Sequence, residues 1–156
     1  MLSGESTLPR GYFGVGIVSS KCPENVGGLW RSAHAFGASM IFTVAFRPPR
    51  QPTDTSKAAK HVPLFSWPDW ETFMAHRPDG CELVAVEQDQ GAARAARMLP
   101  DFKHPERALY ILGSEDRGLS NAVLADCGSM VEIPSSLCLN VATAGSIVLY
   151  DRKAKA

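Results

Sequence analysis

The chain has 156 residues, of which 45% are hydrophobic and 21% are charged, a composition typical of one globular domain. These values exclude a disordered, collagen-like or coiled-coil chain, and the sequence lacks the apolar stretch of about 18 residues that a membrane-spanning helix needs. Sixteen lysine and arginine residues balance sixteen aspartate and glutamate residues, which excludes a strongly basic, histone-like nucleic-acid binder.

The first eleven residues, MLSGESTLPRG, are polar and contain Pro9 and Gly11, so we predict a flexible lead-in over residues 1–11. They have neither the basic start nor the apolar run of a secretory signal. Residues 12–156 are expected to form a single domain. The four cysteines and four histidines are scattered without the spacing of a zinc site, so we predict reduced thiols, a cytoplasmic location and no bound metal.

Strand and helix signals alternate along the chain. We predict, in order, a strand over 12–18, a helix capped by Asn25 and ended by Gly37, a strand over 40–46 and an irregular segment over 47–63. There follow a short strand over 62–65, a helix over 67–76, a strand over 82–87 and a helix over 91–99. The last elements are a strand over 108–113, a helix over 119–126, a strand over 130–134 and a helix over 139–152.

The predicted strands are nearly continuous apolar runs, as expected for strands that are covered on both faces. Their alternation with helices therefore predicts an α/β fold with a mostly parallel sheet flanked by helices. The last helix, LNVATAGSIVLYD, has apolar residues around most of its circumference, whereas a surface helix has one apolar stripe. It could be buried within its own domain, but we favour burial against a second copy, and so predict a homodimer through this helix.

Three loops that follow strands have an unusual composition: ENVGGLWR over 24–31, GSEDRGLS over 113–120 and IPSSLCLNV over 133–141. Ligands of open α/β sheets bind at this end of the strands. Each loop also has an ordinary interpretation: a capped helix with a surface arginine, a glycine-bounded turn, and a helix cap. The acidic residues of the second loop argue against a phosphate ligand.

In this order and spacing, the three loops resemble the signature motifs of the SpoU-like, or TrmH-like, RNA 2′-O-ribose methyltransferases of the SPOUT superfamily. The family patterns N-x-G-x-x-x-R, G-x-E-x-x-G and I-P-x(n)-S-L-N-V-S stand here as NVGGLWR from Asn25, GSEDRG from Gly113, and IP through LNVA from Ile133. The resemblance covers residues 12–151. We therefore expect no extra RNA-binding domain of the kind that some relatives carry, since the chain is similar to minimal members, several of which modify tRNA.

The resemblance implies a trefoil knot in the C-terminal third, a homodimer, and S-adenosylmethionine as the cofactor. It implies that Arg31 is the catalytic arginine, and that Asn25, Glu115 and Asn140 shape the site. The residues expected to contact the cofactor are Val86, Glu87, Gly113, Gly118, Ile133, Cys138, Leu139 and Asn140. The implied activity is methyl transfer to a ribose 2′-hydroxyl of RNA, with tRNA favoured over rRNA.

RNA contact requires local positive charge, because phosphate neutralisation supplies most non-specific affinity. The best candidates are Arg47, Arg50, Lys57 and Lys60 in the irregular segment, joined by Lys21 near the first motif. The alternative is that this segment is a solvated face.

Two departures from the family pattern affect the chemistry: Ala142 stands in place of the serine after LNV, and Cys138 in place of the serine before LN. They leave open an alternative in which the protein is a catalytically impaired RNA-binding homologue. An unrelated nucleotide-binding enzyme would need a phosphate-binding glycine loop, and the sequence contains no such pattern.

Overall fold

The computed structural model describes residues 11–48, 58–88 and 95–156, so most of the predicted lead-in over 1–11 lies outside the described residues. Within them, seven strands form one sheet in the order β3-β2-β1-β6-β4-β7-β5, and every pairing is parallel. The strands are β1 (Phe13–Val18), β2 (Met40–Val44), β3 (Leu64–Trp67), β4 (Glu82–Val86), β5 (Arg97–Met98), β6 (Ala108–Leu112) and β7 (Ser129–Glu132). The predicted α/β fold with a parallel sheet is confirmed.

Helices cover both faces of the sheet. They are α1 (Pro23–Phe36), α2 (Trp70–His76), α3 (Asn121–Asp126) and α4 (Val141–Lys155), with 3-10 turns at η1 (Ala58–Lys60) and η2 (Leu99–Asp101). Successive side chains of a strand point to opposite faces, so Tyr110 of β6 packs in the core under α1 and α4. Its neighbours Leu109 and Ile111 pack in the second core, under α2 and α3. This two-sided burial explains the continuous apolar runs.

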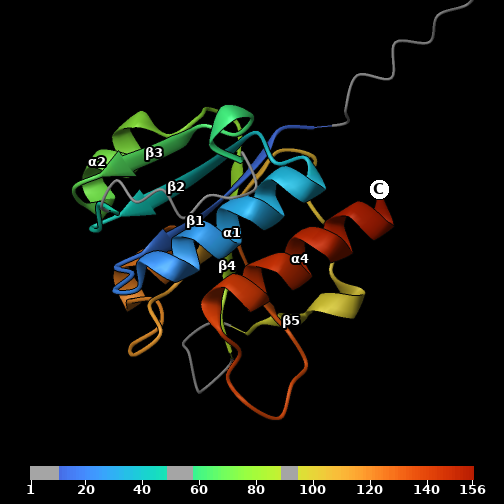
Figure 1. Cartoon of the computed structure of the whole chain (residues 1–156). Helices are drawn as coiled ribbons and strands as arrows, with labels where there is room; N and C mark the ends of the chain where they lie inside the picture. Colours follow the sequence, from blue (N-terminus) through green and yellow to red (C-terminus); the bar gives the residue numbers. More distant parts are fainter. Residues whose placement is uncertain (1–10, 49–57, 89–94) are drawn as a thin grey trace, which may run out of the picture.

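Helices α1 and α4 lie side by side and run in the same direction (Figure 1). Equivalent positions meet at intervals of one turn: the hydroxyls of Ser32 and Ser146 are 2.6 Å apart, and the rings of Phe36 and Tyr150 meet edge to face at 6.0 Å. Gly145 lets the helices approach, because a Cβ at this position would overlap the side chain of Leu29. One side of α4 is therefore buried in its own chain, including Val148 and Leu149, which are fully buried.

A buried polar cluster ties the end of α4 to the sheet. The guanidinium of Arg152 donates to the backbone oxygens of Pro105 and Glu106 and to the hydroxyl of Tyr110. His104 lies between the Tyr110 hydroxyl, at 2.6 Å, and the Asp151 carboxylate, at 2.7 Å. Burial raises the pKa of Tyr110 to about 12 and lowers the pKa of His104, against the opposing effect of Asp151.

None of the four helices begins where it was predicted to begin. Helices α3 and α4 each begin two residues later than predicted, at Asn121 and Val141. Helix α1 begins at Pro23 with Cys22 as its cap, so Asn25 is not the N-cap but lies in the first turn; proline suits this position because its missing N–H has no partner there. Helix α2 begins at Trp70, because the carboxylate of Asp69 accepts a hydrogen bond from Thr72 N at 2.7 Å and caps it. Trp67, predicted as helical, is the last residue of β3.

The helix predicted over 91–99 is also wrong within the described residues 95–99. Residues 91–94 lie outside the described residues, while Arg97–Met98 forms β5, paired with β7, and Leu99–Asp101 forms a 3-10 turn. Pairing at the sheet edge overrides the helix propensity of GAARAARML, since propensity is a weak preference beside tertiary contacts.

In the described part of the chain, no helix is both long and apolar enough to cross a membrane. The trefoil knot implied by the resemblance stays a prediction.

Candidate functional site

The three loops singled out in the sequence meet at the carboxyl edge of the sheet. Since all strands are parallel, the loops after β1, β6 and β7 leave from the same edge. The first supplies Asn25 in the opening turn of α1, the second supplies Glu115, and the third supplies Asn140, which caps α4.

One chain of hydrogen bonds joins these three residues. The side-chain amide of Asn25 donates to Oε1 of Glu115, and its Oδ1 accepts from Nδ2 of Asn140 at 2.9 Å. Oδ1 of Asn140 in turn accepts from the backbone N–H of Thr143 at 3.1 Å. A carboxylate only accepts and a backbone N–H only donates, so both amides have one possible orientation. Asn25 is only 6% exposed, so this bond chain fixes the relative positions of the three loops.

A cavity of about 470 Å³ opens beside this chain, and we call it the acidic cavity. Apolar side chains of Leu112, Ile133 and Leu139 line part of it. The charged residues of its lining are three carboxylates and one cation: Glu87, Glu115, Asp116 and Arg117. Seven of the eight residues expected to contact the cofactor line it: Val86, Glu87, Gly113, Gly118, Ile133, Cys138 and Leu139. Asn140 lies outside this lining, in the hydrogen-bond chain.

The second loop is closed by contacts within the protein. A Cβ at Gly113 would overlap the backbone of Gly118, which itself has a left-handed φ of 62°. The carboxylate of Glu87 accepts from Leu119 N at 2.8 Å and from Gln88 N at 3.1 Å. Glycine at 113 is therefore already required by the turn, and both oxygens of Glu87 accept bonds from the protein.

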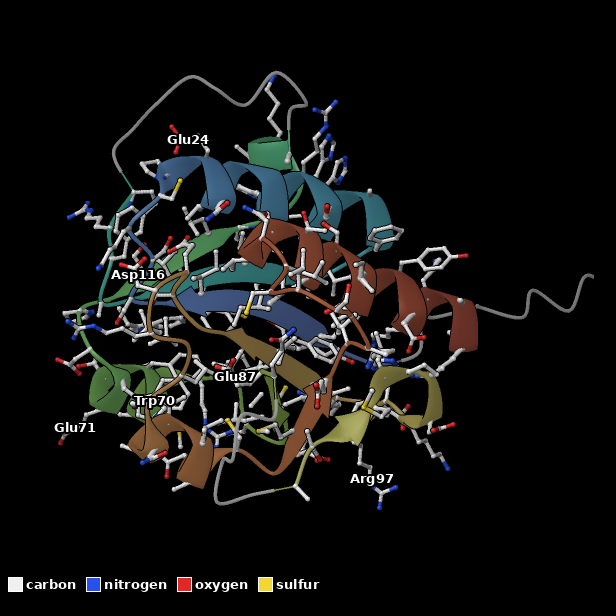
Figure 2. The ribbon with its side chains drawn as sticks, turned by 90° about the horizontal axis from the view of Figure 1, so that it is seen from below. Glu24, Trp70, Glu71, Glu87, Arg97 and Asp116 are labelled. Carbon is white, nitrogen blue, oxygen red and sulfur yellow. The ribbon has the colours of Figure 1, made fainter. Side chains whose placement is uncertain are left out.

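A pair of exposed charges connects the first loop to the second. Lys21 Nζ lies 2.6 Å from Asp116 Oδ2 and lowers the pKa of that carboxyl. Figure 2 shows Asp116 at the end of the molecule where α1 begins, the end at which Glu24 lies. Lys21, predicted to contact RNA, is thus engaged with Asp116, although a pair this exposed is worth little and leaves the lysine available.

Arg31, Arg47 and Lys60 are not among the residues that line the acidic cavity. Arg31 is exposed on α1, and among residues 11–48, 58–88 and 95–156 it has no hydrogen-bond or ion-pair partner. Arg47 and Lys60 are exposed as well. Arg50 and Lys57 lie outside the described residues. No group of three or more potential metal-ligand side chains of His, Cys, Asp and Glu gathers in the described residues.

Sequence reasoning missed Gln88, which holds the third loop. Its side-chain amide donates to Ser135 Oγ at 3.2 Å and to Leu137 O at 3.3 Å, and its Oε1 accepts from Cys138 Sγ at 3.2 Å. The only signal in the sequence is its place after a predicted strand, which does not reveal a partner about fifty residues away.

Comparison with known proteins identifies this arrangement. The sequence model of the SpoU rRNA Methylase family matches residues 13–150. The chain belongs to this family. The family assignment agrees with the resemblance carried by the three loops, and the sheet is that of solved SpoU structures.

SpoU relatives act on different RNAs. The chain is 28% identical over 153 residues to the 23S rRNA (uridine(2479)-2′-O)-methyltransferase of Streptomyces viridochromogenes, covering 90% of this chain and 52% of that protein. The SpoU methyltransferase AviRb of the same species, solved in complex with the cofactor AdoMet, is 24% identical with a TM-score of 0.76. That match covers 96% of this chain and 62% of the solved one.

A third match is a structure solved for the 2-OH methylation of C/U34 on tRNA. It is 24% identical with a TM-score of 0.74 and covers 92% of this chain and 95% of the solved one. The present chain thus spans about half of the Streptomyces rRNA methyltransferase and nearly all of the tRNA-related chain.

Proposed function

We propose that this protein transfers a methyl group from S-adenosylmethionine to a ribose 2′-hydroxyl of RNA. The observation that carries the proposal is the hydrogen-bond chain from Glu115 through Asn25 to Asn140. One residue of each family motif takes part in it, at the rim of a cavity of suitable size. Family membership supports RNA methyl transfer as the reaction, and the positions of the site residues support the role that we assign to each of them.

The acidic cavity suits the cofactor chemically. Its apolar side chains, Leu112, Ile133 and Leu139, can pack against an adenine ring. Its three carboxylates outnumber the one cation of the lining, Arg117, so the cavity suits a cofactor that carries a sulfonium and an ammonium better than it suits a phosphate. When bound, S-adenosylmethionine supplies a methyl group that is already activated for transfer.

The protein's task is then to prepare the ribose hydroxyl, a weak nucleophile. Arg31 stays charged at any working pH and offers a planar fork of donors. We assign it the binding of the phosphate next to the target ribose and the stabilisation of negative charge on the attacking oxygen. Asn25, six residues earlier on the same helix, aligns α1 with the two cofactor loops.

The serine of the family pattern has no counterpart at Ala142. A Cβ at Gly28 would lie 3.3 Å from the methyl group of Ala142, so that methyl faces α1, and its backbone oxygen accepts from Ser146. This departure is the specific observation that favours the alternative, a catalytically impaired RNA-binding homologue.

Between substrates we favour tRNA, because the tRNA-related structure is matched over almost its whole length.

We infer that two copies pair through α4. A groove of about 370 Å³ between α1 and α4 is lined by Phe36, Ile147 and Tyr150, and Tyr150 is 61% exposed. Exposed apolar grooves of this kind usually mark an interface. Sedimentation equilibrium should give twice the protomer mass, and a monomer at micromolar concentration would contradict the pairing.

We also propose a cytoplasmic location. Cys22, Cys81 and Cys138 form no disulfide, in keeping with a reducing compartment.

The test is an Arg31 series assayed with labelled cofactor on bulk tRNA and bulk rRNA. Arg31→Ala should lower methyl transfer by about 10²–10³-fold, while Arg31→Lys keeps the charge and should lose less. Calorimetry should show unchanged cofactor affinity, because Arg31 lies outside the cavity lining. If Arg31→Ala loses cofactor binding as severely as activity, the assigned role is wrong. If wild-type protein binds cofactor and RNA without methylating either substrate, the non-catalytic alternative holds.

A further inference from the structure

A second hollow, of about 870 Å³, opens at the carboxyl ends of β2 and β3. We call it the aromatic hollow, because Trp30 of α1, Trp67 of β3 and Phe46 after β2 line it. Arg47 also lines it. It shares no lining residue with the acidic cavity, so it is a separate feature of the same sheet edge.

The aromatic walls of this hollow are held in place by the core. The indole N–H of Trp30 donates to Val62 O at 2.8 Å. Trp67 packs edge-on against Phe73 at 5.4 Å between ring centroids. The chain leaves β2 through Ala45, a non-glycine residue with a left-handed φ of 58°, whose N–H is bonded to Trp67 O at 3.0 Å. Because these aromatic side chains are already ordered, binding a ligand costs less of their conformational entropy.

The charge of the hollow is opposite to that of the acidic cavity. Arg47 is exposed in its lining, and none of the described lining residues carries a carboxylate. Arg31, also exposed, follows Trp30 directly on α1. Fixed aromatic faces beside arginines are the combination that binds unpaired nucleotides, because bases stack on the rings and the guanidinium pairs with phosphate.

The strand order sets the hollow beside the reacting centre. The acidic cavity lies at the ends of β6, β4 and β7, the aromatic hollow lies at the ends of β2 and β3, and β1 separates them. Helix α1, which carries both Asn25 and Arg31, follows β1 and also supplies Trp30 to the hollow. An RNA strand with its target ribose at the start of α1 can therefore reach the hollow with a neighbouring nucleotide.

We propose that the aromatic hollow binds an unpaired base of the RNA next to the target nucleotide, with Arg47 on its phosphate. The proposal rests on the proposed function, which makes RNA the substrate. It adds a requirement for a single-stranded target region, since a paired base cannot stack on these side chains.

The test is binding of a short single-stranded oligoribonucleotide, followed by tryptophan fluorescence, with an abasic oligomer of equal length as the second probe. Phe46→Leu removes an aromatic face but keeps an apolar side chain, and should weaken binding of the oligoribonucleotide about tenfold. Binding of the abasic oligomer should be unchanged, because it makes no stacking contact. Arg47→Gln should weaken both probes, since both carry phosphate.

Tyr12→Leu is the matched control. Tyr12 is a half-buried aromatic residue directly before β1, at the amino edge of the sheet and outside the hollow lining, so its variant should bind both probes like the wild type. Equal binding of oligoribonucleotide by Phe46→Leu and wild type, or an equal loss in Tyr12→Leu, would overturn the proposal. Thermal unfolding and cofactor calorimetry on each variant separate a folding defect from a binding defect. Oligoribonucleotide binding is measured without methyl transfer. The base-binding proposal can therefore be overturned while the methyltransferase proposal holds, and the methyltransferase proposal can be overturned while base binding holds.

Discussion

The side chain of Asn140 has two separate roles, each carried by hydrogen bonds. Its Oδ1 caps α4 by accepting from Thr143 N, while its Nδ2 donates to Asn25 and so joins the third loop to the first. The family pattern identified Asn140, Asn25 and Glu115 as site residues, but it could not predict that they bond to one another. Asn25 is 90 residues from Glu115 and 115 residues from Asn140 in the sequence, and the parallel sheet brings all three residues to one edge.

Asn140→Asp separates the two roles. Aspartate is as good a helix cap as asparagine, so the cap is kept, and the free energy of unfolding should fall only by the lost bond to buried Asn25, about 1 kcal/mol. The carboxylate cannot donate to Asn25, and it adds negative charge near Glu115, so methyl transfer should fall at least about tenfold. Chemical denaturation and the methylation assay measure the two effects. Asn140→Ala, the control, loses the cap as well and should be less stable than the Asp variant by about a further 1 kcal/mol. Full activity in the Asp variant would contradict the role of the bond chain.

At the scale of elements, the sequence patterns predicted those features that depend on residues close together in the sequence. The apolar runs of β1, β2, β4, β6 and β7 were predicted as strands because these strands are buried on both faces. The more exposed β3 begins two residues later than predicted. Gly37 ends α1 as predicted, with a left-handed φ of 80°. Single-sequence patterns could not show that α1 and α4 pack in parallel, or that β5 forms at 97–98 by pairing with β7. Those outcomes depend on contacts between distant segments, which override propensity.

Two glycines test the packing of α1 against α4. A Cβ at Gly145 would overlap Leu29 and crowd Leu112, so Gly145→Ala should cost about 1–3 kcal/mol of stability. A Cβ at Gly27, on the exposed side of α1, would meet nothing within 4 Å, so Gly27→Ala should stabilise by about 0.5–1 kcal/mol. Urea denaturation of both variants measures the difference. Two variants of equal stability would show that the helices do not pack this closely.

At the scale of the whole molecule, the buried cluster under α4 couples stability to pH. The side chain of His104 is 6% exposed, and burial lowers its pKa below the ordinary value of 6.5 despite the nearby Asp151. As pH falls below 6.5, His104 binds a proton in the unfolded chain but stays neutral in the folded protein. The free energy of unfolding therefore falls until the pH reaches the lowered pKa of His104 in the folded protein. Above that window the histidine contributes no pH dependence.

His104→Gln should therefore flatten the loss of stability between about pH 6.5 and pH 5 relative to the wild type. His76→Gln, at an exposed position of α2 outside the buried cluster, is the control for the loss of a histidine. Denaturation curves across this range measure both slopes. A slope unchanged by the loss of His104 would mean that this histidine titrates alike in the folded and unfolded chains.

The position of the transferred methyl group tests the central proposal most directly. RNA labelled from S-adenosylmethionine by the wild-type protein is hydrolysed in alkali, which cleaves a phosphodiester only where the adjacent 2′-hydroxyl is free to attack. A methyl group on the ribose oxygen blocks this cleavage, so the label should appear in alkali-stable dinucleotides. Label in mononucleotides would place the methyl group on a base and would contradict ribose methylation as the function of this site.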